Sequence, residues 1–219
     1  MSNAMKVISL NVSLPKVVHW KGRDVSTGIF KEPASGPVML RRLDFEGDLQ
    51  ADLTAHGGRS KAAYIYPSEH YAYWKNELPG MELPWGMFGE NLTTADLNEN
   101  DTHIGDSLRI GKAVVVVTQP RTPCFKLGIK FGRDDIIKRF LESRRSGFYV
   151  SVREEGMVEA GDTIELLEED PERVAIAELN RLYVEGTHDP SVIERAVRVK
   201  VLPDGWRDYL LNELRPQEP

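Results

Sequence analysis

Residues 115–130 read VVVTQPRTPCFKLGIK and combine a β-branched run, two prolines and the single cysteine of the chain. Because β-branched residues favour strands, we expect a strand over Ala113–Thr118. Pro120 and Pro123 each fix φ and lack a backbone donor, which predicts a stiff bend directly after that strand. Loops held on a rigid scaffold are common places for functional residues. The stretch therefore indicates a sheet protein that carries Cys124 where a strand ends.

Further β-type runs, separated by Gly, Pro, Asn and Asp, occur between residues 5 and 167: Lys6–Val12, Val38–Phe45, Ala62–Tyr66, Ser107–Ile110, Gly147–Val152 and Thr163–Leu167. They predict a mainly β domain, a barrel or a sandwich. Two helices are expected to interrupt it. One spans PSEHYAYWKNEL at 67–78, with Ser68 as N-cap, and the other spans GRDDIIKRFLESRRSG at 132–147.

A helical period replaces the strand pattern after Leu167. Three amphipathic helices are predicted in EEDPERVAIAELNRLYVEG, HDPSVIERAVRVKVL and PDGWRDYLLNELRP. Asp189 is the expected N-cap of the second, with Pro190 at its first position. We therefore predict a β domain at residues 5–167 and a small three-helix domain at residues 171–215. Residues 1–4, Met-Ser-Asn-Ala, are interpreted as an expression-tag remnant.

Composition narrows the function classes. The chain of 219 residues is 41% hydrophobic and 28% charged, which is ordinary for a soluble globular protein. It contains neither a long apolar run of membrane-span length nor a signal-peptide pattern, so we expect a cytoplasmic protein with no membrane partner. The net charge of −6 argues against a nucleic-acid partner. A single cysteine excludes an intramolecular disulfide or a Cys-ligated iron–sulfur cluster, so any redox chemistry needs a bound cofactor or another protein.

Cys124 has two interpretations from its neighbours. Arg121 and Lys126 are close in sequence and would favour a thiolate, the form that attacks or binds metals. A free cysteine is equally at home as a small buried hydrophobe. The residues around it leave both possibilities open.

Other stretches carry weaker signals. HGGRSKA at 56–62 would let backbone amides and two cations hold an oxyanion, or would simply be a tight turn before a strand. In FGENLTT at 88–94, Asn91 can hydrogen-bond backbone with both its donor and its acceptor, and a turn-forming role is favoured. Arg144 and Arg145 are interpreted first as a solvated basic end of a helix, although they could also reach an anionic ligand. Asp106 and Asp162, each after a glycine, read as structural turn residues. The scattered histidines give little support to a His-ligated metal.

In chain order these pieces are a Gly-Asp at 47–48, HGG at 56–58, GENL at 89–92, IGD at 104–106, PRTPC at 120–124, GFY at 147–149 and a Gly-Asp at 161–162. This order resembles the MOSC family, named for the C-terminal domain of the molybdenum-cofactor sulfurase. The resemblance runs from about Leu43 to Leu166. Residues 171–215 are similar to the three-helix extension of a stand-alone bacterial subgroup.

The resemblance implies a β-barrel fold and a site for the molybdenum cofactor, molybdopterin, in which Cys124 is the catalytic residue and the metal ligand. Phe125, Tyr149 and His56 are candidates for lining the pocket. The cofactor-binding residues it implies are His56, Gly57, Gly58, Arg59, Lys61, Asn91, Arg121, Lys126, Arg145 and Tyr149. The implied activity is reduction of N-hydroxylated compounds such as hydroxylamino purines, a detoxification. Because the chain has no cluster-binding cysteines, the electrons would come from a separate reductase. A monomer or a homodimer is expected.

Two alternatives remain from the sequence. Cys124 could carry the cofactor, or sulfur as a persulfide, without turnover. It could also serve a metal-free thiol enzyme, although no second thiol could resolve a sulfenic acid within the chain. The three-helix segment could in addition act as an interaction module.

Overall fold

The computed structural model describes residues 4–49, 58–186 and 189–214. The strands are β1 Lys6–Val12, β2 Lys16–Trp20, β3 Arg23–Thr27, β4 Glu32–Pro33, β5 Val38–Leu40, β6 Ala63–Pro67, β7 Leu92–Ala95, β8 Ser107–Ile110, β9 Ala113–Pro120, β10 Phe148–Glu154, β11 Gly156–Val158 and β12 Ile164–Glu168. The α-helices are α1 Glu69–Glu77, α2 Phe125–Phe131, α3 Ile136–Ser143, α4 Ile176–Glu185, α5 Pro190–Arg198 and α6 Asp204–Glu213, with a 3₁₀ turn at Arg59–Lys61.

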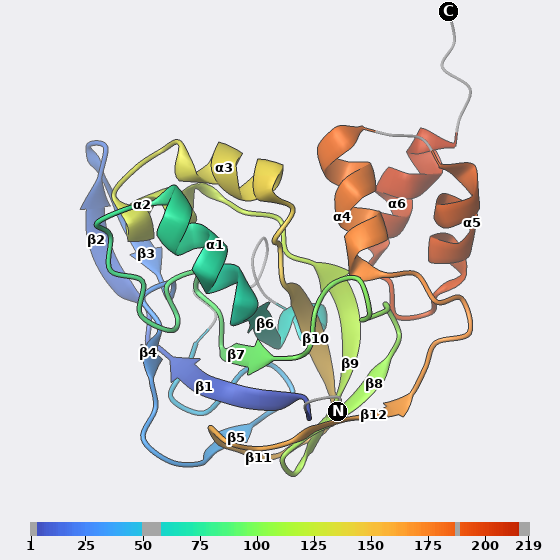
Figure 1. Ribbon diagram of the computed structural model, residues 1–219, viewed down its shortest axis with the longest axis horizontal. Helices are drawn as coiled ribbons and strands as arrows, with labels where there is room; N and C mark the ends of the chain where they lie inside the picture. The colour runs from blue at the N-terminus through green and yellow to red at the C-terminus, as the bar shows by residue number, and fades with distance from the viewer. Residues whose placement is uncertain (1–3, 50–57, 187–188, 215–219) are drawn as a thin grey trace, which may run out of the picture.

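One mixed sheet dominates the fold. Its eight strands lie in the order β12-β8-β9-β10-β6-β7-β1-β4, and two smaller sheets pair β11 with β5 and β2 with β3. Most neighbours in the large sheet are antiparallel, but β6 and β7 are parallel, with Ile65 opposite Leu92. Figure 1 shows α1–α3 and α4–α6 as two groups beside the sheet. A sheet-dominated fold was predicted, and the described residues add six α-helices to it.

The ends of the large sheet approach each other. Lys6 at the start of β1 forms an isolated antiparallel bridge with Thr163, just before β12. The Val7 amide donates to the Asp162 carbonyl over 2.9 Å, and the Ile164 amide donates to the Met5 carbonyl over 2.8 Å. Among the described residues this is a bridge and not a ladder of paired strands. The closed barrel therefore stays a prediction.

Most predicted strands are confirmed. The runs at residues 6–12 and 107–110 have the predicted bounds, and four others are shifted by one or two residues at an end. The run predicted at Val38–Phe45 is shorter, because only Val38–Leu40 pairs with β11. Strands β2, β3, β4, β7 and β11 were missed. The β2–β3 hairpin turns at Lys21 and Gly22, which both have positive φ, without the Asn-Gly signal that marks such turns.

The helices confirm the predicted segments and add one. Asp189 caps α5, its carboxylate accepting from the Ser191 and Val192 amides, and Pro190 is the first helical residue. Ser68 occupies the N-cap position of α1, but its side chain makes no capping hydrogen bond. Helix α2 was not predicted. No helix among the described residues has the length and apolar composition needed to span a bilayer.

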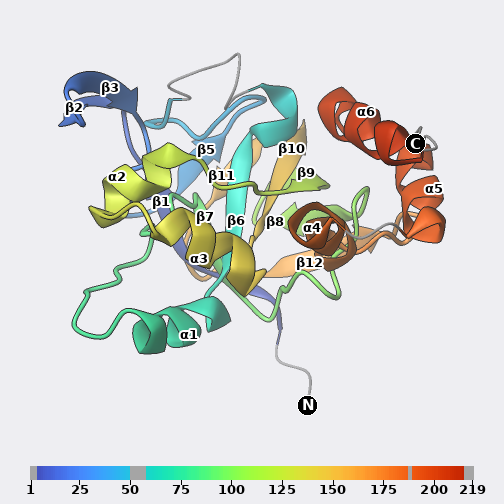
Figure 2. The ribbon, with the colours of Figure 1, turned by 90° about the horizontal axis from the view of Figure 1, so that it is seen from above.

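Two hydrophobic clusters hold the fold together. The larger cluster contains buried residues of the large sheet and continues into α4–α6, so that Leu179 and Trp206 belong to the same cluster as Val115. The division into two domains therefore stays a prediction. The second cluster is aromatic and lies beneath α1–α3, where the Tyr66 and Phe88 rings stack with centroids 4.6 Å apart. In Figure 2 these three helices cover the end of the molecule that holds β6 and β7.

Candidate functional site

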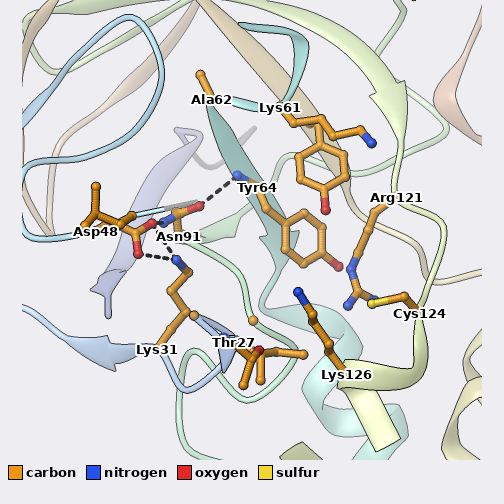
Figure 3. Close-up of a pocket in the computed structure, with 15 residues that line it drawn as sticks. Thr27, Lys31, Asp48, Lys61, Ala62, Tyr64, Asn91, Arg121, Cys124 and Lys126 are labelled. Atoms are coloured by element: carbon orange, nitrogen blue, oxygen red, sulfur yellow. Dashed lines mark hydrogen bonds and ion pairs between the residues drawn. The ribbon is translucent and has the colours of Figure 1, made fainter. Parts of the chain in front are cut away.

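A cavity of about 130 Å³ opens where β9 ends and α2 begins. Its walls come from segments far apart in the sequence, which the sheet brings together (Figure 3). The lining residues are Thr27, Gly28, Ile29, Lys31, Asp48, Leu49, Lys61, Ala62, Tyr64, Gly89, Asn91, Arg121, Cys124, Lys126 and Tyr149. Four of these are lysines or arginines and one is an aspartate, so cations predominate around the only thiol of the chain.

Cys124 reaches this cavity because β9 stops at Pro120. Pro120 is still paired with Phe148 of β10, and the chain then leaves the sheet. Cys124 has an extended backbone, with φ −126° and ψ 173°, and stands directly before α2. Its carbonyl accepts a hydrogen bond from the Leu127 amide at 2.9 Å, in the first turn of α2. The thiol is half-buried, so it is neither a core side chain nor fully solvated. This partial exposure favours Cys124 as part of a cavity wall over the interpretation of a buried hydrophobic residue.

Arg121 is a buried cation beside that thiol. Only 5% of the residue is exposed, and its Nη1 atom has no hydrogen-bond partner among the described residues. The guanidinium lies 5.0 Å from the Tyr64 ring centroid and 4.9 Å from that of Phe140. Burial opposes its charge, yet its pKa is raised because Tyr64 and Tyr149 lie next to it. Figure 3 shows the guanidinium and the Cys124 sulfur pointing toward each other. An unpaired buried donor is costly, so this atom indicates a missing anionic partner.

Lys61 and Tyr149 form a second part of the wall. Gly58, with φ 98°, begins the 3₁₀ turn, and its carbonyl accepts from the Lys61 amide at 3.0 Å. The Lys61 ammonium lies 5.9 Å from the Tyr149 ring centroid. Partial burial lowers the pKa of Lys61, and the nearby Cys124 opposes that shift. Burial raises the pKa of the Tyr149 hydroxyl. The lowered pKa of Lys61 favours proton donation by its ammonium, while the raised pKa of Tyr149 keeps its hydroxyl protonated.

The opposite end of the cavity is an ordered polar network. Lys31 and Asp48 form an ion pair whose side chains are 10% and 5% exposed. Asn91 donates to Asp48 at 2.7 Å and to the Asn11 carbonyl at 3.3 Å, while its own side-chain oxygen accepts from the Tyr64 amide at 3.1 Å. The prediction that Asn91 bonds backbone with both its donor and its acceptor is confirmed. Burial lowers the pKa of Lys31, against the attraction of Asp48.

The structure brings together most of the site residues named from the sequence. Cys124, Lys61, Asn91, Arg121, Lys126 and Tyr149 all line the cavity. Arg59 is exposed outside it, and Gly58 contributes only the turn. Phe125 is 38% exposed beneath the Arg23 guanidinium and does not line it. His56 and Gly57 lie outside the described residues.

Arg145 departs from its predicted place. It lines a different cavity, donates to the Ser143 carbonyl at 2.9 Å and stacks 3.9 Å from the Tyr73 ring centroid. The sequence suggested a shared site because Arg145 is only four residues from Tyr149. The turn at Gly147, with φ 60°, sends the two side chains to different cavities.

Several cavity residues were not named as site residues from the sequence, among them Asp48, Tyr64 and Lys31. Asp48 was noted only as part of a Gly-Asp step, and Tyr64 only as part of a strand. Lys31 lies in an irregular segment that carries no motif. Asp106 and Asp162 are structural as predicted, since their carboxylates accept from the backbone amides of His103 and Glu159. Within the described residues, no group of three or more His, Cys, Asp or Glu side chains is placed to hold a metal ion.

Comparison with known proteins decides the family. Residues 52–165 match the profile of the MOSC domain. The chain belongs to the MOSC family. Residues 174–215 match the YiiM-like, 3-alpha helix domain. The resemblance noted in the sequence is thereby confirmed.

Three relatives place this MOSC protein more closely. The uncharacterized protein YflK of Bacillus subtilis is 42% identical over 207 residues, covering 94% of this chain and 93% of YflK. The crystal structure of YiiM from Geobacillus stearothermophilus has a TM-score of 0.81 and 33% identity, covering 96% of this chain and 100% of that one. A protein named reductase from Gibberella moniliformis is 32% identical over 164 residues, which are 74% of this chain but 29% of that protein.

Proposed function

We propose that this MOSC protein is an oxidoreductase that binds the molybdenum cofactor and reduces N-hydroxylated compounds. The observation that carries the proposal is a half-buried thiol, Cys124, beside a buried guanidinium, Arg121, whose Nη1 has no hydrogen-bond partner in the described part of the chain. Membership of the MOSC family and likeness to part of a protein named reductase support it.

The residues present suit one end of such a cofactor. A thiolate is a good ligand for a soft metal already bound by sulfur. Arg121, Lys61 and Lys126 can bind an oxyanion such as the pterin phosphate, and arginine does so with two parallel hydrogen bonds. The cavity of about 130 Å³ is smaller than the ~300–1,000 Å³ of typical small-molecule sites. It therefore fits the metal end or the phosphate end, with the rest of the cofactor at its mouth.

The chain's own residues would prepare the reaction. When bound, the cofactor would supply a metal centre able to accept an oxygen atom in a two-electron step. Cys124 would anchor that centre, and Arg121 would stabilise negative charge next to it. Conversion of a hydroxylamine to an amine consumes two electrons and two protons and releases water. Lys61 and Tyr149 border the thiol and are placed to supply protons.

The electrons would come from a separate reductase. Cys124 is the only cysteine of the chain, so the chain offers no thiolates for an iron–sulfur cluster of its own. The substrate we propose is a small N-hydroxylated molecule, such as a hydroxylamino purine, bound beside Tyr149.

A carrier role is the second candidate, favoured by the partial exposure of Cys124. A half-buried thiol beside two cations can be reached by a protein or small-molecule sulfur donor. In that role Cys124 would hold a persulfide or the cofactor and pass it on without turnover.

Molybdenum content tests the first proposal. Wild type and Cys124→Ser would be made in a host that synthesises the cofactor, and metal would be measured by mass spectrometry. We expect near one molybdenum per wild-type chain, a large loss in the variant, and wild-type turnover of a hydroxylamino purine with an artificial electron donor. Absence of molybdenum, where a control molybdoenzyme loads, would refute the reductase. Molybdenum without turnover would favour the carrier, and a mass increase of one sulfur on Cys124 would identify the persulfide form.

A further inference from the structure

A second cavity, of about 450 Å³, lies between the turn after α3 and the start of α4. Figure 1 shows the end of α3 and the helix α4 facing each other above β10. The cavity is lined by His70, Glu99, Asn100, Ser143, Arg144, Arg145, Ala177, Glu178 and Arg181. Its volume falls in the range of small-molecule sites, and such sites are frequent where two parts of a fold meet.

Its two walls are held in place by direct contacts. The Asn180 side chain of α4 donates to the Arg144 carbonyl at 2.9 Å, and Arg144 forms an ion pair with Glu185. Arg144, the C-cap of α3, has a positive φ of 57°, and the next residue, Arg145, lines the cavity from the turn after α3. The Arg145 guanidinium is stacked on Tyr73, and an arginine stacked on a ring is already ordered before a ligand arrives.

The acidic groups of the lining already have partners. Both Glu99 oxygens are 2.9 Å from the His70 ring nitrogen, and the Gly147 amide donates to the same carboxylate at 2.8 Å. Glu178 accepts from Arg195 at 2.7 Å and from the Ala175 amide at 2.8 Å. The two carboxylates of the cavity are therefore already hydrogen-bonded within the protein. The guanidinium groups of Arg145 and Arg181, on opposite walls, supply its positive charge.

We propose that this cavity binds a small phosphorylated molecule, with Arg145 and Arg181 holding the phosphate from two sides. A guanidinium has five N–H donors in a planar fork, and among the described residues the Arg145 guanidinium donates to the Ser143 carbonyl. Two such groups from opposite walls match a dianion with several acceptor oxygens better than a single carboxylate. Asn100 and His70 border the remaining space, where polar parts of the same molecule can bind.

This site shares a backbone segment with the cavity at Cys124. The Tyr64 hydroxyl donates to the Ser146 carbonyl at 2.7 Å, and the Arg121 amide donates to the Gly147 carbonyl at 3.3 Å. A phosphate on Arg145 would therefore bind next to residues 146 and 147, which contact the Tyr64 side chain and the Arg121 backbone of the first cavity. Binding at the second site does not depend on the proposed reductase function.

Calorimetric titration with pyrophosphate, at constant ionic strength, tests the site. All proteins carry Arg121→Met, which removes the buried guanidinium of the cavity at Cys124 and so weakens anion binding there. We expect one binding event in that background, weakened roughly tenfold or more by Arg181→Gln or Arg145→Gln, since tenfold corresponds to one lost charge-assisted contact. Arg109→Gln removes a half-exposed arginine from β8, outside the cavity, and should leave binding unchanged.

Position is tested independently by amide chemical shifts. Pyrophosphate should move the Gly147 and Ala177 signals, and Arg181→Gln, at an exposed position of α4, should abolish those shifts while the remaining spectrum stays folded. Absence of binding in the Arg121→Met background would overturn the proposal. Equal affinity for the Arg181→Gln and Arg109→Gln variants would overturn it too.

Discussion

Replacement of Arg121 by methionine should separate ligand binding from folding. The buried Nη1 has no partner among the residues that the structure describes, which costs roughly 1–3 kcal/mol, and methionine removes this cost. The two ring contacts, to Tyr64 and Phe140, contribute roughly 0.5–2 kcal/mol each. Methionine restores part of that through sulfur–aromatic contacts of about 0.3–1.5 kcal/mol. The free energy of unfolding should therefore change by no more than about 2 kcal/mol, a shift in Tm below roughly 8 °C.

Cofactor binding should respond far more strongly. Removing one partner of a buried, hydrogen-bonded charge pair costs roughly 2–5 kcal/mol, which weakens binding by about 30-fold or more. Molybdenum per chain should fall steeply in protein made at limiting cofactor. Thermal unfolding should be compared on protein from a host without the cofactor, since a bound ligand itself raises Tm.

Arg109→Met is the matched control, because the Arg109 side chain is 46% exposed and its ion pair with Glu165 is long, at 3.9 Å. It should change neither Tm nor molybdenum content. A methionine variant at position 121 that loads molybdenum like wild type would refute the role of the guanidinium. A loss of stability well beyond 2 kcal/mol would show that Arg121 serves the fold rather than the ligand.

Three further predictions concern the scaffold. Asn91→Ala should lower the free energy of unfolding, measured in urea, by about 2–4 kcal/mol, because the Tyr64 amide and the Asp48 carboxylate lose a buried hydrogen-bond partner. The control Asn212→Ala, at an exposed position of α6, should cause no measurable change. Equal effects of the two variants would contradict the reasoning. Gly147→Ala should lower the free energy of unfolding by well over the ~1–3 kcal/mol of a strained φ, because its Cβ would lie 2.4 Å from the Ile65 carbonyl oxygen. The Cβ of the control Gly22→Ala meets no atom within 4 Å, so thermal unfolding should show the loss from the strained φ alone. Hydrogen bonds from Arg133 lower the pKa of Asp135 to about 2, so its contribution to stability is complete above its unfolded pKa of about 3.9 and is lost as pH falls toward 2; a carboxyl NMR titration with its midpoint near 3.9 would contradict this.

Local pattern was sufficient for many elements of the fold. The β-branched run before Pro120 predicted β9, and the Asp189-Pro190 pair predicted the start of α5, because both depend on neighbouring residues alone. Strand β7 was missed because the sequence favoured a turn at 88–94. Leu92–Ala95 becomes a strand only by pairing in parallel with β6, a contact between distant segments.

The same distinction holds for the site. The order of short motifs around Cys124 predicted the family and the cysteine, since motif order is a property of the sequence. Only the tertiary structure brought Lys31 and Asp48 to the same cavity, buried Arg121 between two rings and sent Arg145 to another one. Burial, pairing and direction depend on how the sheet joins remote segments, and no local pattern encodes them. The sequence determined which reactive side chains the chain carries, and the packing of the sheet determined which of them lie in the same cavity.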